Sequence, residues 1–175
     1  MSPPKVVFFC LSLATLVAAT AAAAARGPME DGTLTVRDGR GQLTLKFRGS
    51  LIGRLNRGKV TVTASSTGTT TAVVRGWETR EATAQGTVYT GAGIRFRVAD
   101  DRRVTVKLNG KGLNFSAVGR GEAYIDGLGN PSAGIFFDGT YSLNDEAYKS
   151  LPDERTRVEL RAPSPPPSPA APKRG

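Results

Sequence analysis

The fold is decided by Leu43-Thr-Leu-Lys-Phe-Arg-Gly49 and by a similar stretch, Val104-Thr-Val-Lys-Leu-Asn-Gly110, at an offset of 61 residues (43 to 104). A second matching pair follows, Arg57-Gly58-Lys-Val-Thr-Val62 and Arg120-Gly121-Glu-Ala-Tyr-Ile125, at an offset of 63 (57 to 120). One insertion of two residues reconciles the two offsets. The sequence therefore predicts an internal duplication, in which each half contains a strand, a glycine, a short apolar segment, Arg-Gly and a second strand.

Apolar and polar residues alternate through most of the chain after residue 25. Leu43, Leu45 and Phe47 alternate with polar residues, and the same period of two recurs around Phe96. This period is typical of antiparallel strands with one buried and one solvated face. Asp38-Gly39, between two such runs, predicts a hairpin turn. No segment shows a convincing helical period.

These patterns predict an all-β fold, a single antiparallel β-sandwich or closed barrel of about ten strands, built from two similar halves of about 60 residues. Two similar half-sheets can close on each other and leave few exposed edges. A β-solenoid is the alternative architecture. It is less favoured because solenoid repeats are usually shorter and need about three or more copies.

Composition divides the chain into three parts. Residues 1–25 have a basic head, an apolar run and an Ala-x-Ala exit, which predicts a cleaved signal peptide and hence secretion or attachment to the cell envelope. A retained membrane anchor is the alternative, since the run from 6 to 25 is long enough to span a bilayer. Residues 26–160 are expected to form one duplicated β domain. The proline-rich segment 161–175 is expected to be a disordered tail.

The predicted mature chain lacks cysteine and histidine, because Cys10 lies inside the signal peptide and the sequence contains no His. This composition excludes a disulfide framework, a Cys or His metal site, a Ser-His-Asp triad and a Cys-His pair. Adjacent Asp100 and Asp101 suggest turn chemistry rather than calcium, which prefers six or more oxygen ligands. We therefore expect no metal site, no cofactor and no catalytic residue.

The charge of the chain suggests an anionic partner. Without Lys5 the chain has 23 basic and 15 acidic residues, a net charge of +8. Five basic residues at solvated strand positions are the candidate basic surface: Lys46, Arg48, Arg95, Arg97 and Lys107. Such a surface attracts anionic polymers through long-range fields. The alternative explanation is a solvated outer sheet face in an arginine-rich protein.

For an exported protein the anionic partners at hand are envelope polymers, polysaccharides or lipid head groups. We therefore predict a non-enzymatic binding or structural role towards an anionic envelope polymer. Nucleic acid is not an expected partner, because of the compartment and because no RNP-like aromatic motif accompanies the charge. After signal removal, no transmembrane segment is expected.

A carbohydrate-active domain, lectin-like or a weak hydrolase, is the alternative function. Trp77 and Tyr124 are the candidate sugar-stacking platform, although such residues more often fill or cap a β core. A hydrolase would need two carboxyls about 5–10 Å apart. The candidates Glu78, Glu81, Asp126 and Asp138 have no spacing that favours such a pair, and a non-enzymatic role is therefore preferred.

An ordered set of short motifs gives a family resemblance over the whole predicted domain. The motifs are Leu43 to Val62, Tyr89-Thr-Gly91-Ala-Gly93-Ile-Arg-Phe96, Ser116-Ala-Val-Gly-Arg-Gly121, Tyr141-Ser-Leu143 and Leu151-Pro-Asp153. The set resembles a group of exported all-β proteins frequent in high-GC bacterial genomes. This resemblance implies an exported single domain, and it carries over no activity and no site residue.

Overall fold

The computed structural model describes residues 31–64, 69–128 and 138–162, and within these ranges the protein is a single antiparallel β-sheet system. The predicted signal peptide (1–25) and residues 163–175 of the predicted tail lie outside the described residues. Two strands dominate: β1 (Gly32–Thr63) has 32 residues and β4 (Gly86–Gly127) has 42. The five shorter strands are β2 (Thr70–Arg75), β3 (Thr79–Thr83), β5 (Thr140–Leu143), β6 (Lys149–Ser150) and β7 (Thr156–Leu160).

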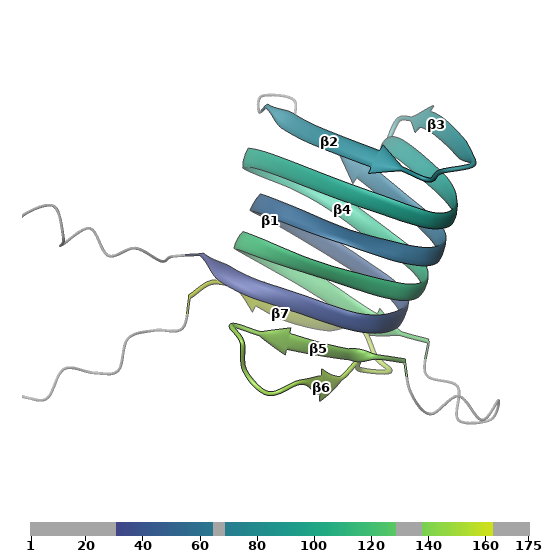
Figure 1. Cartoon of the computed structure of the whole chain (residues 1–175). Helices are drawn as coiled ribbons and strands as arrows, with labels where there is room; N and C mark the ends of the chain where they lie inside the picture. The colour runs from purple at the N-terminus through teal and green to yellow at the C-terminus, as the bar shows by residue number, and fades with distance from the viewer. Residues whose placement is uncertain (1–30, 65–68, 129–137, 163–175) are drawn as a thin grey trace, which may run out of the picture.

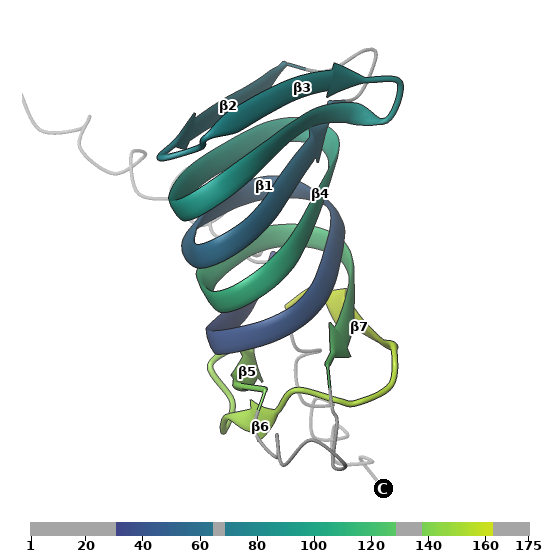
Figure 2. The ribbon, with the colours of Figure 1, turned by 90° about the vertical axis from the view of Figure 1, so that its right-hand side faces the viewer.

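β1 and β4 wind around each other, so that most of β1 has β4 as its neighbour on both sides (Figure 1). Leu43, for example, lies opposite Leu108 on one side and opposite Ile125 on the other. Leu51 lies opposite both Val98 and Ala117. Each of the two long strands therefore supplies several neighbouring segments of the same sheet. The short strands extend the sheet at both ends (Figures 1 and 2).

The winding flattens the sheet into two layers that face each other, as in a β-sandwich (Figure 2). We call layer A the paired segments 42–48 and 59–63 of β1, 86–90, 104–109 and 121–126 of β4, and strands β3 and β7. We call layer B the paired segments 32–37 and 50–55 of β1, 94–99 and 113–118 of β4, and strands β2, β5 and β6, which form the front layer in Figure 1.

Paired glycines stand where the chain passes from one layer to the other. Gly49 of β1 lies opposite Gly119 of β4, with φ angles of 134° and 154°. A Cβ atom on Gly49 would lie 2.1 Å from the Val118 carbonyl oxygen. Gly58 and Gly110 repeat this arrangement one bend further along. Only glycine allows these bends, because it alone tolerates both the backbone angle and the close approach of the partner strand.

The core lies between the layers and is built by the inward side chains of the alternating runs. Leu43, Leu45 and Phe47 from layer A and Leu51 and Leu55 from layer B are fully buried. The remaining buried apolar residues of β1 and β4 join them in one cluster. The period of two seen in the sequence thus separates an apolar interior from a solvated exterior on both layers.

The prediction of an all-β antiparallel fold is confirmed, whereas the number and limits of the strands differ. Among the described residues there are seven strands rather than about ten, and the sheet is not closed into a barrel. The glycines expected to end strands instead bend them, and the pairing continues through each bend. The winding resembles a solenoid, but neighbouring segments of the sheet belong alternately to the two antiparallel strands β1 and β4.

The hairpin predicted at Asp38-Gly39 is wrong. Asp38 has a left-handed φ of 48°, as expected of a turn residue. The chain nevertheless stays in β1 and passes there from layer B to layer A, so the flanking runs do not pair with each other. The two similar stretches of the sequence do lie side by side, with Leu43 opposite Leu108 and Phe47 opposite Val104. The duplication itself stays a prediction.

Candidate anion-binding surface

Three arginines form a row across the outer face of layer B. Arg95 of β4 lies opposite Arg54 of β1 on one side and opposite Arg75 of β2 on the other. All three side chains are exposed. Directly opposite residues on one sheet face are roughly 5 Å apart, and like charges in such positions destabilise the sheet. The row is therefore a feature that folding alone does not favour.

A second row, two residues along the strands, combines a cation with apolar side chains. Arg97 lies opposite Ile52 on one side and opposite Val73 on the other. Ile52 is 58% exposed and Val73 is 46% exposed. Together the two rows line an open groove of about 470 Å³, to which Gly53, Phe96 and Asn114 also contribute. The lining of the groove thus combines four arginines with an apolar base, by which we mean the side chains of Ile52, Val73 and Phe96.

No carboxylate neutralises these arginines within the described part of the chain. All segments of layer B lack Asp and Glu, and Arg54, Arg75, Arg95 and Arg97 form no ion pair or hydrogen bond through their side chains. Their guanidinium groups are free to bind an anion. Arginine offers a planar fork of donors that matches the oxygens of a phosphate or carboxylate.

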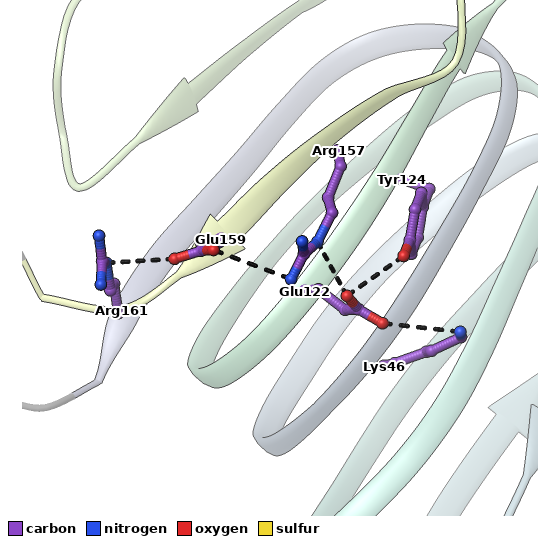
Figure 3. Close-up of polar contacts among 6 residues, drawn as sticks. All are labelled: Lys46, Glu122, Tyr124, Arg157, Glu159 and Arg161. Atoms are coloured by element: carbon purple, nitrogen blue, oxygen red, sulfur yellow. Dashed lines mark hydrogen bonds and ion pairs between the residues drawn. The ribbon is translucent and has the colours of Figure 1, made fainter.

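In layer A, by contrast, part of the charge is paired across the strands (Figure 3). Glu122 lies 2.9 Å from Arg157 Nε and 3.6 Å from Lys46 Nζ, and its Oε2 accepts a hydrogen bond of 3.2 Å from the Tyr124 hydroxyl. The chain of contacts continues through Glu159, which lies 3.8 Å from Arg157 and 3.3 Å from Arg161. The cations of this network are therefore already satisfied.

The environment of Glu122 favours its charged form. Desolvation by the surrounding sheet acts to raise the pKa of this carboxyl, but the Tyr124 hydroxyl and the charges of Arg157 and Lys46 together outweigh it. The net result is a lowered pKa. Glu122 consequently remains ionised, and the network persists, at pH values where an isolated glutamate begins to protonate.

The structure divides the five predicted basic residues between the two layers. Arg95 and Arg97 lie in the groove of layer B. Lys46, Arg48 and Lys107 belong to layer A, where Lys46 also lies over the Tyr124 ring at 5.4 Å from its centroid. The expected single surface of five cations is therefore not formed.

Sequence reasoning missed Arg54, Arg75 and the apolar base of the groove. Ile52 and Arg54 follow the alternation of Leu51 and Leu55, and this pattern already indicates that they face outward. Their positions opposite Arg97 and Arg95 depend on the pairing of β1 with β4, for which the sequence has no local signal.

The two predicted sugar-binding aromatics do not form one platform. Trp77 is 44% exposed between β2 and β3, and its ring lies 6.4 Å from the Tyr89 ring. Tyr124 lies in layer A between Lys46 and Arg155, both of which pack against its ring. Four strand segments separate the two places, which corresponds to about 20 Å at ordinary strand spacing.

The candidate carboxylates likewise give no argument for catalysis. Glu78 and Glu81 are exposed near the β3 edge, where Glu78 accepts a hydrogen bond of 3.2 Å from the Ala92 amide. Asp126 and Asp138 belong to the region at the end of β4, on the far side of layer A. Across residues 31–64, 69–128 and 138–162 there is no group of three potential metal ligands.

Comparison with protein-family models, with curated proteins and with solved structures gave no match for this chain. In the described ranges there is also no helix long and apolar enough to cross a membrane. The surface of layer B is therefore the main indication of function, and the resemblance to exported all-β proteins stays an expectation.

Proposed function

We propose that this protein is an exported, non-enzymatic binding domain whose layer B attaches to an anionic polymer of the cell envelope. The observation that carries the proposal is the row of Arg54, Arg95 and Arg75, which form no ion pair with any carboxylate of the described residues. Unpaired arginines aligned on one face generate a positive field that attracts polyanions and favours their retention. Layer A also has cations without an ion pair among the described residues, Arg48, Lys59 and Lys107, but its four carboxylates reduce its net charge to +2 and weaken its attraction for polyanions.

The direction of the row suits a linear polymer. The three arginines come from three adjacent strands, so the row runs across the strands with steps of roughly 5 Å. Successive anionic groups of an extended polymer lying along this line would each meet a guanidinium. The open groove leaves both ends of such a polymer free, as binding to a long chain requires.

The proposal can be tested by measuring the affinity of the purified protein for inorganic polyphosphate and for isolated envelope fractions. The test variant is Arg54→Gln, Arg95→Gln and Arg97→Gln combined. A matched control on layer A combines Arg48→Gln, Lys59→Gln and Lys107→Gln, which removes the same charge from exposed positions. The layer B variant should lose roughly 100-fold in affinity at low salt, at about 1 kcal/mol for each lost cation.

The control should lose much less, and wild-type binding should weaken as salt screens the exposed charges. Equal losses in the two triple variants would show that net charge, rather than layer B, determines binding. Binding that resists salt and is displaced by a neutral sugar would favour the carbohydrate-binding alternative. Absence of binding to both probes would overturn the proposal.

A further inference from the structure

We propose that the groove of layer B binds anionic phospholipid at a membrane surface, with the arginines on the phosphates and the apolar side chains against the hydrocarbon. This inference rests on the anion-binding layer B of the proposed function and goes beyond it, because the ligand is a lipid surface instead of a hydrophilic polymer. The reason is that an unpaired cation row and an exposed apolar cluster occupy the same face.

The exposed large apolar side chains of the described strands gather on layer B. Ile52 and Val73 lie in the groove, and Val118, which is 45% exposed, lies opposite Ser50 in the row beyond Ile52. The other exposed large hydrophobic residues, Trp77, Leu128 and Tyr148, belong to connections between strands. Exposed apolar residues are common singly, but a group bordered by charge indicates a binding surface.

A fully hydrophilic polymer would use only half of this surface. Its anionic groups would satisfy the arginines, while Ile52 and Val73 would remain against a hydrated chain. A lipid has both components, since its phosphate matches the guanidinium fork and its hydrocarbon removes apolar area from water. Membrane-surface proteins combine basic and apolar side chains in the same way.

The position of the groove favours a lipid surface over a single enclosed ligand. Its arginines, Ile52 and Val73 are exposed on the outer face of layer B, whereas Phe96 is the one lining residue that also belongs to the core between the layers. The groove is therefore open on one side and can lie against a flat array of head groups. Arginine stems pack along apolar surface while their charged ends reach phosphate, which suits a position at the interface between head groups and hydrocarbon.

The experiment compares vesicle binding with binding to a soluble polyanion. Sedimentation is measured with vesicles of mixed phosphatidylglycerol and phosphatidylcholine, with vesicles of phosphatidylcholine alone, and in parallel with inorganic polyphosphate. The test variant is Ile52→Thr with Val73→Thr, which keeps a β-branched residue at each strand position. The control, Val88→Thr with Leu128→Thr, removes two apolar side chains outside the groove.

Wild-type protein should bind the anionic vesicles and not the neutral ones. The Ile52/Val73 variant should bind anionic vesicles about tenfold more weakly, because each threonine hydroxyl replaces apolar contact with the hydrocarbon, and should keep its affinity for polyphosphate. The control variant should match the wild type. Thermal unfolding verifies that both variants fold. If the Ile52/Val73 variant does not fold, Val73→Thr alone, on the edge strand β2, replaces it.

Unchanged vesicle binding in the Ile52/Val73 variant would overturn the lipid inference, and retained binding of polyphosphate would leave the proposed function standing. Failure of the wild type to bind either vesicles or polyphosphate would overturn both. Equal vesicle losses in the test and control variants would also contradict the inference, because the groove would then have no special part in binding.

Discussion

The two layers are built from the same two strands and share one core, yet their outer faces differ in charge. Each layer carries six Lys or Arg residues, but layer A also carries four Asp or Glu, giving net charges of +2 and +6. The acidic residues of layer A are Glu81, Glu122, Asp126 and Glu159. Because both layers meet the same demands of folding on their inner faces, the difference between their outer faces points to a role outside folding.

The largest loss of stability is expected from substitutions at the bends that join the two layers. Gly49→Ala should lower the free energy of unfolding by about 3 kcal/mol, because alanine at a φ of 134° is strained and its Cβ would meet the Val118 carbonyl oxygen. Urea unfolding measures this loss. Since the bend joins segment 42–48 of layer A to segment 50–55 of layer B, both layers should lose order together.

Gly93→Ala is the matched control, since Gly93 also stands at a bend of β4. Its φ is 70°, but no atom lies within 4 Å of the added Cβ. The expected loss is about 1 kcal/mol, from the left-handed backbone alone. Equal losses at Gly49 and Gly93 would show that backbone angle, and not the close approach of β1 and β4, makes glycine necessary at the bends.

The sequence predicts the secondary structure and the core well because both depend on local alternation. Leu43, Leu45, Phe47, Ile94 and Phe96 all lie inside, as the period of two requires. The glycines were less informative, since Gly49 and Gly58 look like strand ends in sequence. In space they are bends, because the hydrogen-bonded partner strand bends at the same place.

The candidate site was only partly predictable because it depends on register over long distances. Arg54 and Arg95 are 41 residues apart (54 to 95), and Arg75 comes from a third strand. Their alignment requires that segment 94–99 of β4 pairs with β1 on one side and with β2 on the other. The alternating pattern identifies Arg95 and Arg97 as solvated residues. Which residues lie beside them depends on how β1, β2 and β4 pair.

The next largest change in stability is expected in the network of paired charges around Glu122 in layer A. Glu122→Gln should destabilise the protein at neutral pH, because Arg157 and Lys46 lose their common carboxylate. Since the pKa of Glu122 is lowered below 4.5 in the folded state, its contribution is full above the unfolded value and disappears as pH falls through the folded value. Urea unfolding at pH 7 and at pH 3 measures the difference in stability between the wild type and Glu122→Gln.

The stability of wild type and Glu122→Gln should therefore converge in acid. Glu81→Gln, at an exposed position of β3 without an ion pair among the described residues, provides the control and should change stability little at either pH. A constant difference between wild type and Glu122→Gln from pH 7 to pH 3 would contradict the proposed ionic origin of the effect.

The smallest effect should have the opposite sign and concerns the unbalanced charges of layer B. Arg95→Thr relieves the repulsion by Arg54 and Arg75 and introduces a good strand residue, so it should raise the free energy of unfolding by about 0.5 kcal/mol at low salt. The same variant should bind polyphosphate more weakly. A gain in stability joined to a loss of binding is expected where a residue is kept for function.

Lys107→Thr tests whether this gain belongs to layer B. Lys107 is a cation in the middle of layer A, but its neighbours on both sides are Thr44 and Thr61. Its replacement removes the same charge without relieving a directly opposite cation, so its stabilising effect should be smaller and less dependent on salt. If Arg95→Thr and Lys107→Thr changed stability equally at low and high salt, the arginine row would carry no strain, and the unpaired charges of layer B would lose their main argument for function.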